Sequence, residues 1–163
     1  NLNALLQEAL TPHRDAAPEK WYGGRAFRVG DKVTQLRNNY DKGAAGIFNG
    51  TVGVVTGLSL EQQTLTVLTD EDEPVDYDFA ELDELAHAYA VTIHRSQGSE
   101  YPAVVIPLTT SSWTMLQRNL LYTGVTRARK LIVLAGSRRA LAQAVRTPGA
   151  GRRHTALTHR LRA

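Results

Sequence analysis

The sequence predicts an α/β fold in which a small antiparallel β-barrel precedes a parallel sheet flanked by helices. Between Gly30 and Phe79, short segments rich in β-branched residues, such as TVGVVTGL and TLTVLT, follow the turn-forming pair Asn49-Gly50. After Leu85, apolar strand-like segments alternate with helical ones. This alternation is typical of a parallel sheet covered on both faces, and the chain is long enough for one or two compact units.

The first part of the chain is predicted to form a short helix followed by the strands of the barrel. Residues 2–10 carry apolar side chains at helical spacing, and Thr11-Pro12 ends the pattern. We expect one face of this helix to be buried. The segment FRVGDKVTQLRNNY, from Phe27 to Tyr40, is predicted to be extended, and four or five short antiparallel strands are expected between Gly30 and Phe79. The segment DEDEP that follows Thr69 is expected to be a solvated acidic turn rather than a metal site.

The second part is predicted to alternate strands and helices. Strands are expected at 88–94 (AYAVTIH), 103–108 (AVVIPL) and 131–136 (LIVLAG). Helices are expected at 115–129 (MLQRNLLYTGVTRAR) and 137–145 (SRRALAQAV). The last segment, 147–163, is rich in Arg, His, Gly and Pro and is expected to be a mobile basic extension.

Charge divides the chain into an acidic and a basic part. All 16 acidic residues lie at or before Glu100, so the first hundred residues sum to 8 − 16 = −8 and the remainder to +11. A carboxylate-free basic segment suits a polyanion such as nucleic acid or a nucleotide phosphate, although a solvated basic face is the alternative. The basic residues that lie closest together in sequence are Arg127, Arg129, Lys130, Arg138 and Arg139.

Several classes of protein are disfavoured by composition. The chain has no cysteine, which excludes a disulfide framework and thiolate zinc sites. It has no run of eighteen apolar residues and no secretion signal. We therefore expect a cytoplasmic protein without membrane segments. Because the sequence begins at Asn1 rather than Met, we also expect it to be part of a longer chain.

Two segments have the composition of phosphate-binding sites. TIHRSQGSE, from Thr92 to Glu100, follows a predicted strand, and its glycine and hydroxyl residues let backbone amides approach a phosphate. A plain strand-to-helix turn is the alternative, and a hydrolase is disfavoured because no GxSxG elbow is present. YTGVTRARK, from Tyr122 to Lys130, places arginines at a helix end beside a sheet edge where ligands collect. Cations that only complement the helix dipole are the alternative there.

Together, these two segments resemble motifs V and VI of superfamily-one helicases, and the RecD/TraA branch in particular. The first segment begins at residue 92 and the second at residue 122, thirty residues later. A third segment, GDKVTQLRNNYDKGAAGIFNGTVGVV, resembles the SH3-like barrel inserted in the second motor domain of that branch. The matches extend from Leu2 to Leu141, so the resemblance implies a C-terminal segment with a partial RecA-like sheet and an inserted SH3-like barrel.

The resemblance also implies domain boundaries. Residues 1–26 would be a helix and linker of the RecA-like motor domain, and 27–86 the SH3-like barrel. Residues 87–146 would be the rest of the motor domain with motifs V and VI, and 147–163 the basic tail.

Roles for individual residues follow from the same resemblance. Arg127 would be the arginine finger, which reaches the γ-phosphate of ATP held by the other motor domain. Gly98 would bring backbone close to that phosphate, and Glu100 would contact the ribose. The residues expected to contact single-stranded DNA are Thr92, His94 and Ser96 along its track, and Arg37, Asn38 and Asn39 at the mouth of the barrel.

The sequence lacks the loop that holds ATP in such a helicase. No GxxxxGK[ST] segment is present: from Gly24 to Lys32 the second glycine comes one position too late. The acidic pair at 83–84 lacks the preceding buried strand of a magnesium site. ATP and Mg²⁺ are therefore expected to bind mainly to the N-terminal motor domain of the same parent chain. The fragment alone is expected to bind neither and to hydrolyse no ATP, and the resemblance implies 5′ to 3′ movement.

A non-catalytic adaptor is the alternative hypothesis. In that case the barrel and the basic tail would bind nucleic acid or a protein, and the sheet would be a scaffold. A phosphate loop encoded upstream in the same reading frame would favour the helicase, whereas a native start near Asn1 would favour the adaptor.

Overall fold

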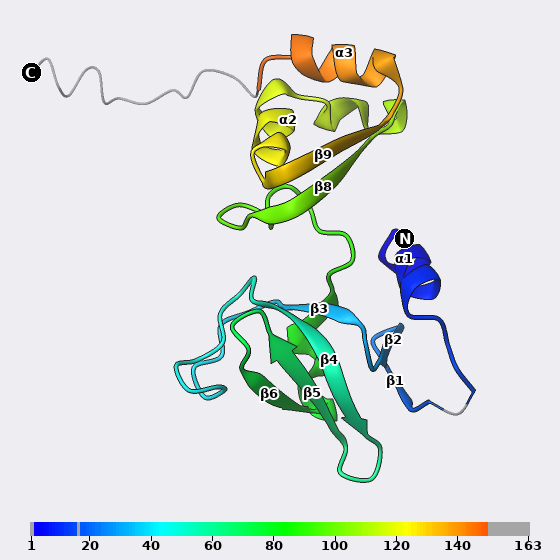
Figure 1. Cartoon of the computed structure of the whole chain (residues 1–163), viewed down its shortest axis with the longest axis vertical. Helices are drawn as coiled ribbons and strands as arrows, with labels where there is room; N and C mark the ends of the chain where they lie inside the picture. The colour runs from blue at the N-terminus through cyan, green and yellow to red at the C-terminus, as the bar shows by residue number, and fades with distance from the viewer. Residues whose placement is uncertain (1, 16, 150–163) are drawn as a thin grey trace, which may run out of the picture. The chain divides into compact units, whose positions relative to one another are not determined.

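The computed structural model describes residues 2–15 and 17–149, and the chain forms two compact units (Figure 1). Residues 1–92 form the first, here called the barrel unit, and residues 93–163 the second, the sheet unit. Each unit has its own cluster of buried apolar side chains.

The barrel unit contains a five-stranded antiparallel sheet, and four of its strands lie between Gly30 and Phe79, within the four or five predicted there. Its strand order is β6-β5-β4-β3-β7. Buried and exposed residues alternate along β5 and β6, so Leu65, Val67, Val75 and Tyr77 point into the core. The elements are β3 (Lys32–Gln35), β4 (Val52–Ser59), β5 (Thr64–Thr69), β6 (Pro74–Asp78), the 3-10 helix η1 (Phe79–Glu84) and β7 (Leu85–His87).

The turn predicted at Asn49-Gly50 is present, but it is not a two-residue hairpin. Gly50 has φ +97°, and the Thr51 amide donates to the Phe48 carbonyl at 3.0 Å. Strands β3 and β4 are instead joined by residues 36–51, a loop narrowed by an isolated bridge between Asn39 and Ile47. The segment predicted to be extended from Phe27 to Tyr40 is thus interrupted by a turn at 29–30, and its last strand ends at Gln35, apart from that bridge.

Helix α1 (Leu2–Leu10) forms as predicted, but the expected buried apolar face is wrong. Leu2, Leu5 and Leu10 are exposed, and Gln7 is the buried residue of the helix. Its amide donates to Asp31 Oδ2 at 2.7 Å and to the Ala26 carbonyl at 2.8 Å. The polar side chain of Gln7 thus holds the helix, because the buried carboxylate of Asp31 needs hydrogen-bond donors.

Between α1 and the barrel lies a hairpin of β1 (Glu19–Tyr22) and β2 (Arg25–Arg28). Ala26 and Phe27 of β2 are buried, and Phe27 belongs to the barrel core. The assignment of residues 1–26 to the motor domain stays a prediction.

The sheet unit is built on two parallel strands, as predicted. They are β8 (Tyr101–Leu108) and β9 (Ala128–Gly136), joined through the 3-10 helix η2 (Thr110–Met115) and α2 (Arg118–Val125), and followed by α3 (Arg138–Arg146). The core residues are Ile106, Leu108, Leu116, Ala140 and Ala144. Helix α2 is shorter than the predicted 115–129, because β9 already begins at Ala128.

Two expectations for this unit are wrong. Residues 88–94 form no strand: 88–92 are irregular and 93–98 are turns. The sheet is also not covered on both faces. Val105 is 64% exposed and Leu131 56%, while Val104 and Ile132 on the other face pack against the core. Side chains of α2 and α3 pack on that one face, and among the described residues no third strand pairs with β8 or β9.

The predicted basic tail begins at Thr147, and its residues from 150 onward lie outside the described part of the chain. None of the described helices is long and apolar enough to cross a membrane.

Candidate functional site

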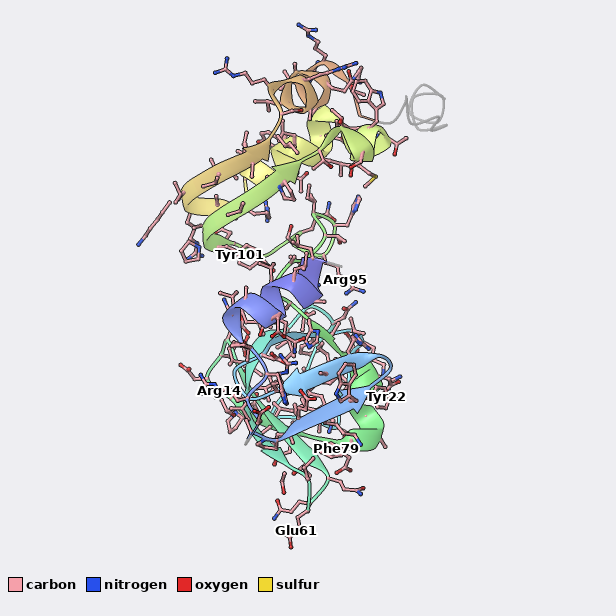
Figure 2. All side chains as sticks on the ribbon, turned by 90° about the vertical axis from the view of Figure 1, so that its right-hand side faces the viewer. Arg14, Tyr22, Glu61, Phe79, Arg95 and Tyr101 are labelled. Atoms are coloured by element: carbon pink, nitrogen blue, oxygen red, sulfur yellow. The ribbon has the colours of Figure 1, made fainter. Side chains whose placement is uncertain are left out.

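The two motif segments meet at the start of β8 and β9. Tyr101 pairs with Ala128 at the first position of the parallel register, and the Tyr101 amide donates to the Arg127 carbonyl at 2.8 Å. Figure 2 shows Tyr101 at this end of the strand pair. The loop 93–100 and the end of α2 are therefore side by side, as predicted. They lie, however, at the amino ends of the strands, whereas the general rule for ligands in parallel sheets refers to carboxyl ends.

Arg127 is positioned by neutral acceptors. Its Nη1 donates to the Ser99 carbonyl at 3.0 Å and its Nε to the Thr123 carbonyl at 3.2 Å. Its Nη2 lies 3.3 Å from Thr126 Oγ1. Within the described residues, no carboxylate forms an ion pair with this partly buried guanidinium. The positive charge is consequently held in place without being neutralised.

The position of Arg127 follows from the way α2 ends and packs. The Thr126 hydroxyl donates to the Thr123 carbonyl at 3.0 Å, and the Arg127 amide donates to the Gly124 carbonyl at 3.2 Å, so the chain leaves the helix in a tight turn. A Cβ on Gly124 would lie 2.8 Å from Ile106 Cδ1. Glycine therefore allows α2 to approach β8 closely, which brings Arg127 to the sheet edge.

Glu100 and Gly98 lie in the loop that faces Arg127. The carboxylate of Glu100 accepts from Arg129 Nε at 2.6 Å, and the two side chains are 50% and 66% exposed. The sequence does not predict this ion pair, because its pattern places Arg129 at the end of a helix rather than on β9. Gly98 has φ +89°, and apart from Gly98 itself and its two chain neighbours no heavy atom of the described residues lies within 4 Å of the position a Cβ would take. Its backbone is thus open to a ligand.

The candidate DNA-contacting residues of motif V are divided between the units. Thr92 is the last residue of the barrel unit, whereas His94 and Ser96 belong to the sheet unit. His94 is exposed. Ser96 is only 6% exposed, and its hydroxyl donates to the Ile93 carbonyl at 2.8 Å. The Ser96 side chain thus closes a turn of the loop.

The barrel candidates surround a buried carboxylate that sequence reasoning did not single out. Arg37 Nη2 donates to Glu84 Oε1 at 3.0 Å, and Asn39 Nδ2 lies 3.1 Å from both Glu84 oxygens. Burial acts to raise the pKa of Glu84, but the hydrogen bonds from Asn39, Arg37 and Gln35 outweigh it and lower the pKa below its usual value. The side-chain oxygen Oδ1 of Asn38 accepts from the backbone amide of Asn49 at 2.9 Å. These side chains fix the loop 36–51 in place.

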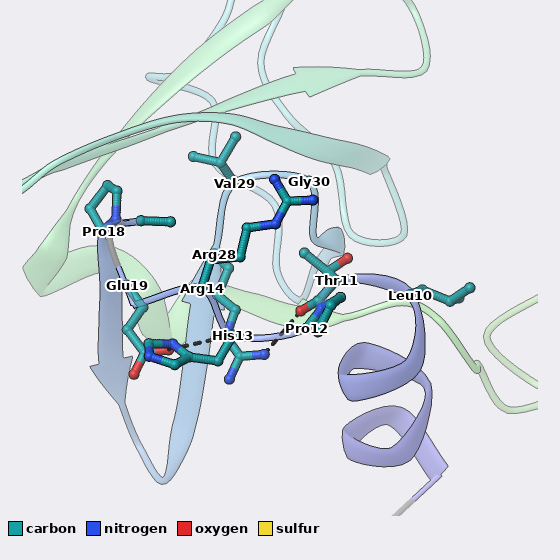
Figure 3. A pocket seen from close by; sticks show the side chains of 11 residues that line it. Leu10, Thr11, Pro12, His13, Arg14, Pro18, Glu19, Arg28, Val29 and Gly30 are labelled. Carbon is teal, nitrogen blue, oxygen red and sulfur yellow. Dashed lines mark hydrogen bonds and ion pairs between the residues drawn. The ribbon is translucent and has the colours of Figure 1, made fainter.

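A hollow of about 400 Å³ opens in the barrel unit beside α1 (Figure 3). Arg28 crosses it, with Nε 3.0 Å from Glu19 Oε2 and Nη1 3.2 Å from Glu8 Oε2. The pKa of Glu19 is lowered overall, and the hydrogen bond from the Trp21 indole is the largest cause. Burial acts to raise this pKa, but hydrogen bonds from Arg28 and His13 lower it further. None of the predicted site residues lines this hollow.

Two protein-family models match the chain. Residues 2–68 match the ATP-dependent RecD-like DNA helicase SH3 domain, and residues 87–135 match the UvrD-like helicase C-terminal domain. The first match includes the residues of α1. Together the two models cover most of the described residues.

Curated relatives are consistent with both models. The chain is 43% identical to the ATP-dependent RecD2 DNA helicase of Deinococcus radiodurans over 83% of its own length and 18% of the relative's. It is 34% identical to the RecBCD enzyme subunit RecD of Mycobacterium tuberculosis over 77% of its length and 20% of the relative's. The chain therefore spans about a fifth of the length of these relatives.

Solved structures share the fold. The Bacteroides Pif1 helicase in complex with ADP-AlF3 and ssDNA superposes with a TM-score of 0.61 at 21% identity, over 99% of this chain and 41% of that one. A structure of two coordinating Pif1 helicases at forked dsDNA gives a TM-score of 0.63, also at 21% identity and over the same shares of the two chains. Motifs, family models and fold agree. The chain belongs to the RecD-type superfamily-one DNA helicases, of which it carries the SH3 domain and the UvrD-like C-terminal domain.

Proposed function

We propose that this chain is the C-terminal part of an ATP-dependent DNA helicase and supplies the arginine finger for ATP hydrolysis. The observation that carries the proposal is the guanidinium of Arg127, which is fixed beside the loop 93–100 and forms no ion pair with a carboxylate among the described residues. The relatives support it: the D. radiodurans protein is an ATP-dependent helicase, and a Pif1 structure holds ADP-AlF3 and ssDNA.

The chemistry suits phosphoryl transfer. In the transition state, negative charge spreads over the equatorial oxygens of the γ-phosphoryl group, and a planar guanidinium binds two such oxygens at once. The present acceptors of Arg127, the carbonyls of Ser99 and Thr123, are neutral. Exchanging a neutral acceptor for an anionic oxygen strengthens the hydrogen bond. Arg127 is therefore held near its working position without a competing counter-ion.

The remaining nucleotide contacts come from the loop that faces Arg127. The open backbone at Gly98 fits close approach of a phosphate. The exposed carboxylate of Glu100 accepts hydrogen bonds from ribose hydroxyls in this proposal. The phosphate loop and the ligands of Mg²⁺ are assigned to the N-terminal motor domain of the parent chain, which makes that domain the partner of this segment.

Single-stranded DNA is the proposed substrate of the same loop. Exposed His94 reaches the strand directly, and Thr92 and Ser96 shape its track. His94 and Gly98 belong to one loop, and the Ser99 carbonyl of the same loop accepts a hydrogen bond from Arg127. A change at the nucleotide is therefore transmitted through this loop to the DNA contact. Movement from 5′ to 3′ is proposed from the family.

The test is Arg127→Ala in the full-length parent protein. Loss of a transition-state arginine lowers turnover by about 10³–10⁵, so DNA-stimulated ATP hydrolysis should fall by at least that lower figure while DNA affinity is retained. Lys130→Ala is the matched control, because Lys130 is an exposed cation three residues further on. A twofold effect of Arg127→Ala would contradict the proposal and favour a non-catalytic adaptor.

A further inference from the structure

The carboxyl ends of β8 and β9 carry an exposed surface that the proposed nucleotide and DNA contacts do not use. Strand β8 leads into η2 and strand β9 leads into α3, and Figure 1 shows both connections at the same end of the strand pair. The side chains concerned are here called the tryptophan patch: Ser111, Ser112, Trp113, Arg138 and Arg139.

An arginine lies over the exposed tryptophan. The Cζ of Arg139 is 5.9 Å from the ring centroid of Trp113, and Trp113 remains 44% exposed. The next residue of α3, Ala140, is fully buried, and its amide is capped by the Ser137 hydroxyl at 3.1 Å. The helix that carries Arg139 is therefore anchored, and the indole and the guanidinium form a preorganised pair.

Hydroxyl groups lie beside the pair. The Thr109 hydroxyl is 2.9 Å from the Ser111 hydroxyl and 3.5 Å from that of Ser112, and all three residues are exposed. Since a hydroxyl both donates and accepts, this cluster can donate to phosphate oxygens.

The charge around the patch selects a polyanion. After Glu100, the sequence contains no Asp or Glu at all. The barrel unit offers a useful contrast: Tyr40 and Phe48 form an exposed aromatic pair, but the neighbouring cations Arg37 and Lys42 are paired with Glu84 and Glu81. At the tryptophan patch, by contrast, the exposed ring of Trp113 lies beside Arg138 and Arg139. Among the described residues, no carboxylate forms an ion pair with either arginine.

We propose that the tryptophan patch is a second binding site for single-stranded nucleic acid. A base stacks on Trp113, and Arg138 and Arg139 bind the adjoining phosphates. Aromatic stacking combined with a basic surface is how proteins bind single strands without sequence preference. The eight residues of β8 separate this site from Arg127 by about 25 Å at the usual rise of a strand. The proposal is thus independent of the arginine-finger role.

Tryptophan fluorescence tests the stacking directly, because the chain has two tryptophans. In Trp21→Phe, Trp113 is the remaining tryptophan, and oligothymidylate should quench its emission. In Trp113→Phe, the remaining Trp21 lies exposed in the barrel unit, and the same oligonucleotide should leave its emission unchanged.

Affinity measured by anisotropy of a labelled oligothymidylate tests the energetics in the full 163-residue chain. Trp113→Ala should weaken binding about tenfold, whereas Trp113→Phe, which retains a ring, should stay within about twofold of the unmodified chain. Arg139→Ala should also reduce the slope of log affinity against log salt by about 0.7, the contribution of one phosphate on a single strand. Trp21→Ala is the matched control and should bind normally.

Unchanged Trp113 emission at saturating oligonucleotide, or unchanged affinity of Trp113→Ala, would overturn the proposal and assign the patch to a protein partner. Absence of any binding by the chain would overturn it as well. Neither result bears on Arg127, whose role is measured by ATP hydrolysis in the parent protein.

Discussion

Arg129 Nε lies 2.6 Å from Glu100 Oε2, so the carboxylate proposed to contact the ribose is engaged by a neighbouring cation on β9. Both side chains are at least half exposed. Such a surface ion pair contributes about 0–1 kcal/mol, and a ligand can displace it. The pair holds Glu100 beside the loop of the proposed nucleotide contacts without burying its carboxylate.

The proposed contact between Glu100 and the ribose predicts a preference between nucleotides. In the parent protein, ATP should bind more tightly than its 2′-deoxy analogue, and Glu100→Gln should reduce that preference because an amide is a weaker acceptor for a hydroxyl than a carboxylate. Equilibrium titration with both nucleotides measures the ratio. Arg129→Ala should preserve the preference. An equal ratio in Glu100→Gln and the unmodified protein would remove Glu100 from the site.

The buried carboxylate of Asp31 should be essential for the stability of the barrel unit. It is fully buried and accepts from the Gln7 amide at 2.7 Å, the Arg28 backbone amide at 2.8 Å and the Tyr89 hydroxyl at 2.8 Å. Asp31→Ala leaves these donors without an acceptor, which should lower the free energy of unfolding by about 3 kcal/mol. Urea denaturation measures the loss.

The matched control for Asp31→Ala is Asp70→Ala, in the exposed acidic turn. An exposed substitution of this kind should change the free energy of unfolding by less than about 0.5 kcal/mol. Equal effects of the two substitutions would show that the buried hydrogen bonds do not hold α1 to the barrel.

Glu84 should make the barrel unit sensitive to acid. Burial raises its pKa, but bonds from Asn39, Arg37 and Gln35 outweigh this and lower it overall. The stability gained is therefore complete above the pKa of an unfolded glutamate, about 4.3, and is lost as pH falls through the lower folded pKa. Below about pH 4.3, the unfolding free energy of the unmodified chain should fall more steeply than that of Glu84→Gln.

Urea titrations at neutral and acidic pH test the role of Glu84. Glu71→Gln, in the exposed acidic turn, is the control and should follow the unmodified chain. If Glu84→Gln loses stability with acid as steeply as the unmodified chain, other carboxylates control the acid transition.

The barrel strands and the parallel strand pair could be predicted from sequence because each has a local signal. Segments rich in β-branched residues predict β4 and β5, and continuous apolar runs predict β8 and β9. The adjacency of Arg127 and Ser99 could also be predicted, because the two recognised motifs come directly before two strands that pair in parallel, β8 and β9. The strand expected at 88–94 did not form, since a strand needs a hydrogen-bonded neighbour that a local pattern cannot supply.

The partners of the site residues could not be predicted from the motifs. Ser96 matches a DNA-contact position, yet its hydroxyl closes a turn on Ile93. Asn39 lies in the segment expected at the barrel mouth, yet its amide binds Glu84, forty-five residues away. In the sequence, the acidic pair at 83–84 suggests at most a magnesium site, and nothing in the local pattern predicts that Glu84 binds Asn39. Long-range pairing of polar groups has no periodic signature in sequence.

Two glycines should respond differently to alanine, and the difference tests how tightly each unit is packed. A Cβ on Gly53 would lie 2.4 Å from Val67 Cγ1 and 2.7 Å from the Leu68 carbonyl oxygen. Because backbone cannot move aside, Gly53→Ala should destabilise the barrel unit by about 2–3 kcal/mol. A Cβ on Gly124 would instead meet Ile106 Cδ1, the flexible end of a side chain, at 2.8 Å.

In α2, alanine is favoured over glycine by about 1 kcal/mol, which offsets the displacement of Ile106. Gly124→Ala should therefore change the unfolding free energy by less than about 1 kcal/mol, as measured by chemical denaturation. A large loss from Gly124→Ala would mean that α2 cannot move relative to β8. The position of Arg127 would then depend on this one contact, and Gly124→Ala in the parent protein should lower ATP hydrolysis together with stability.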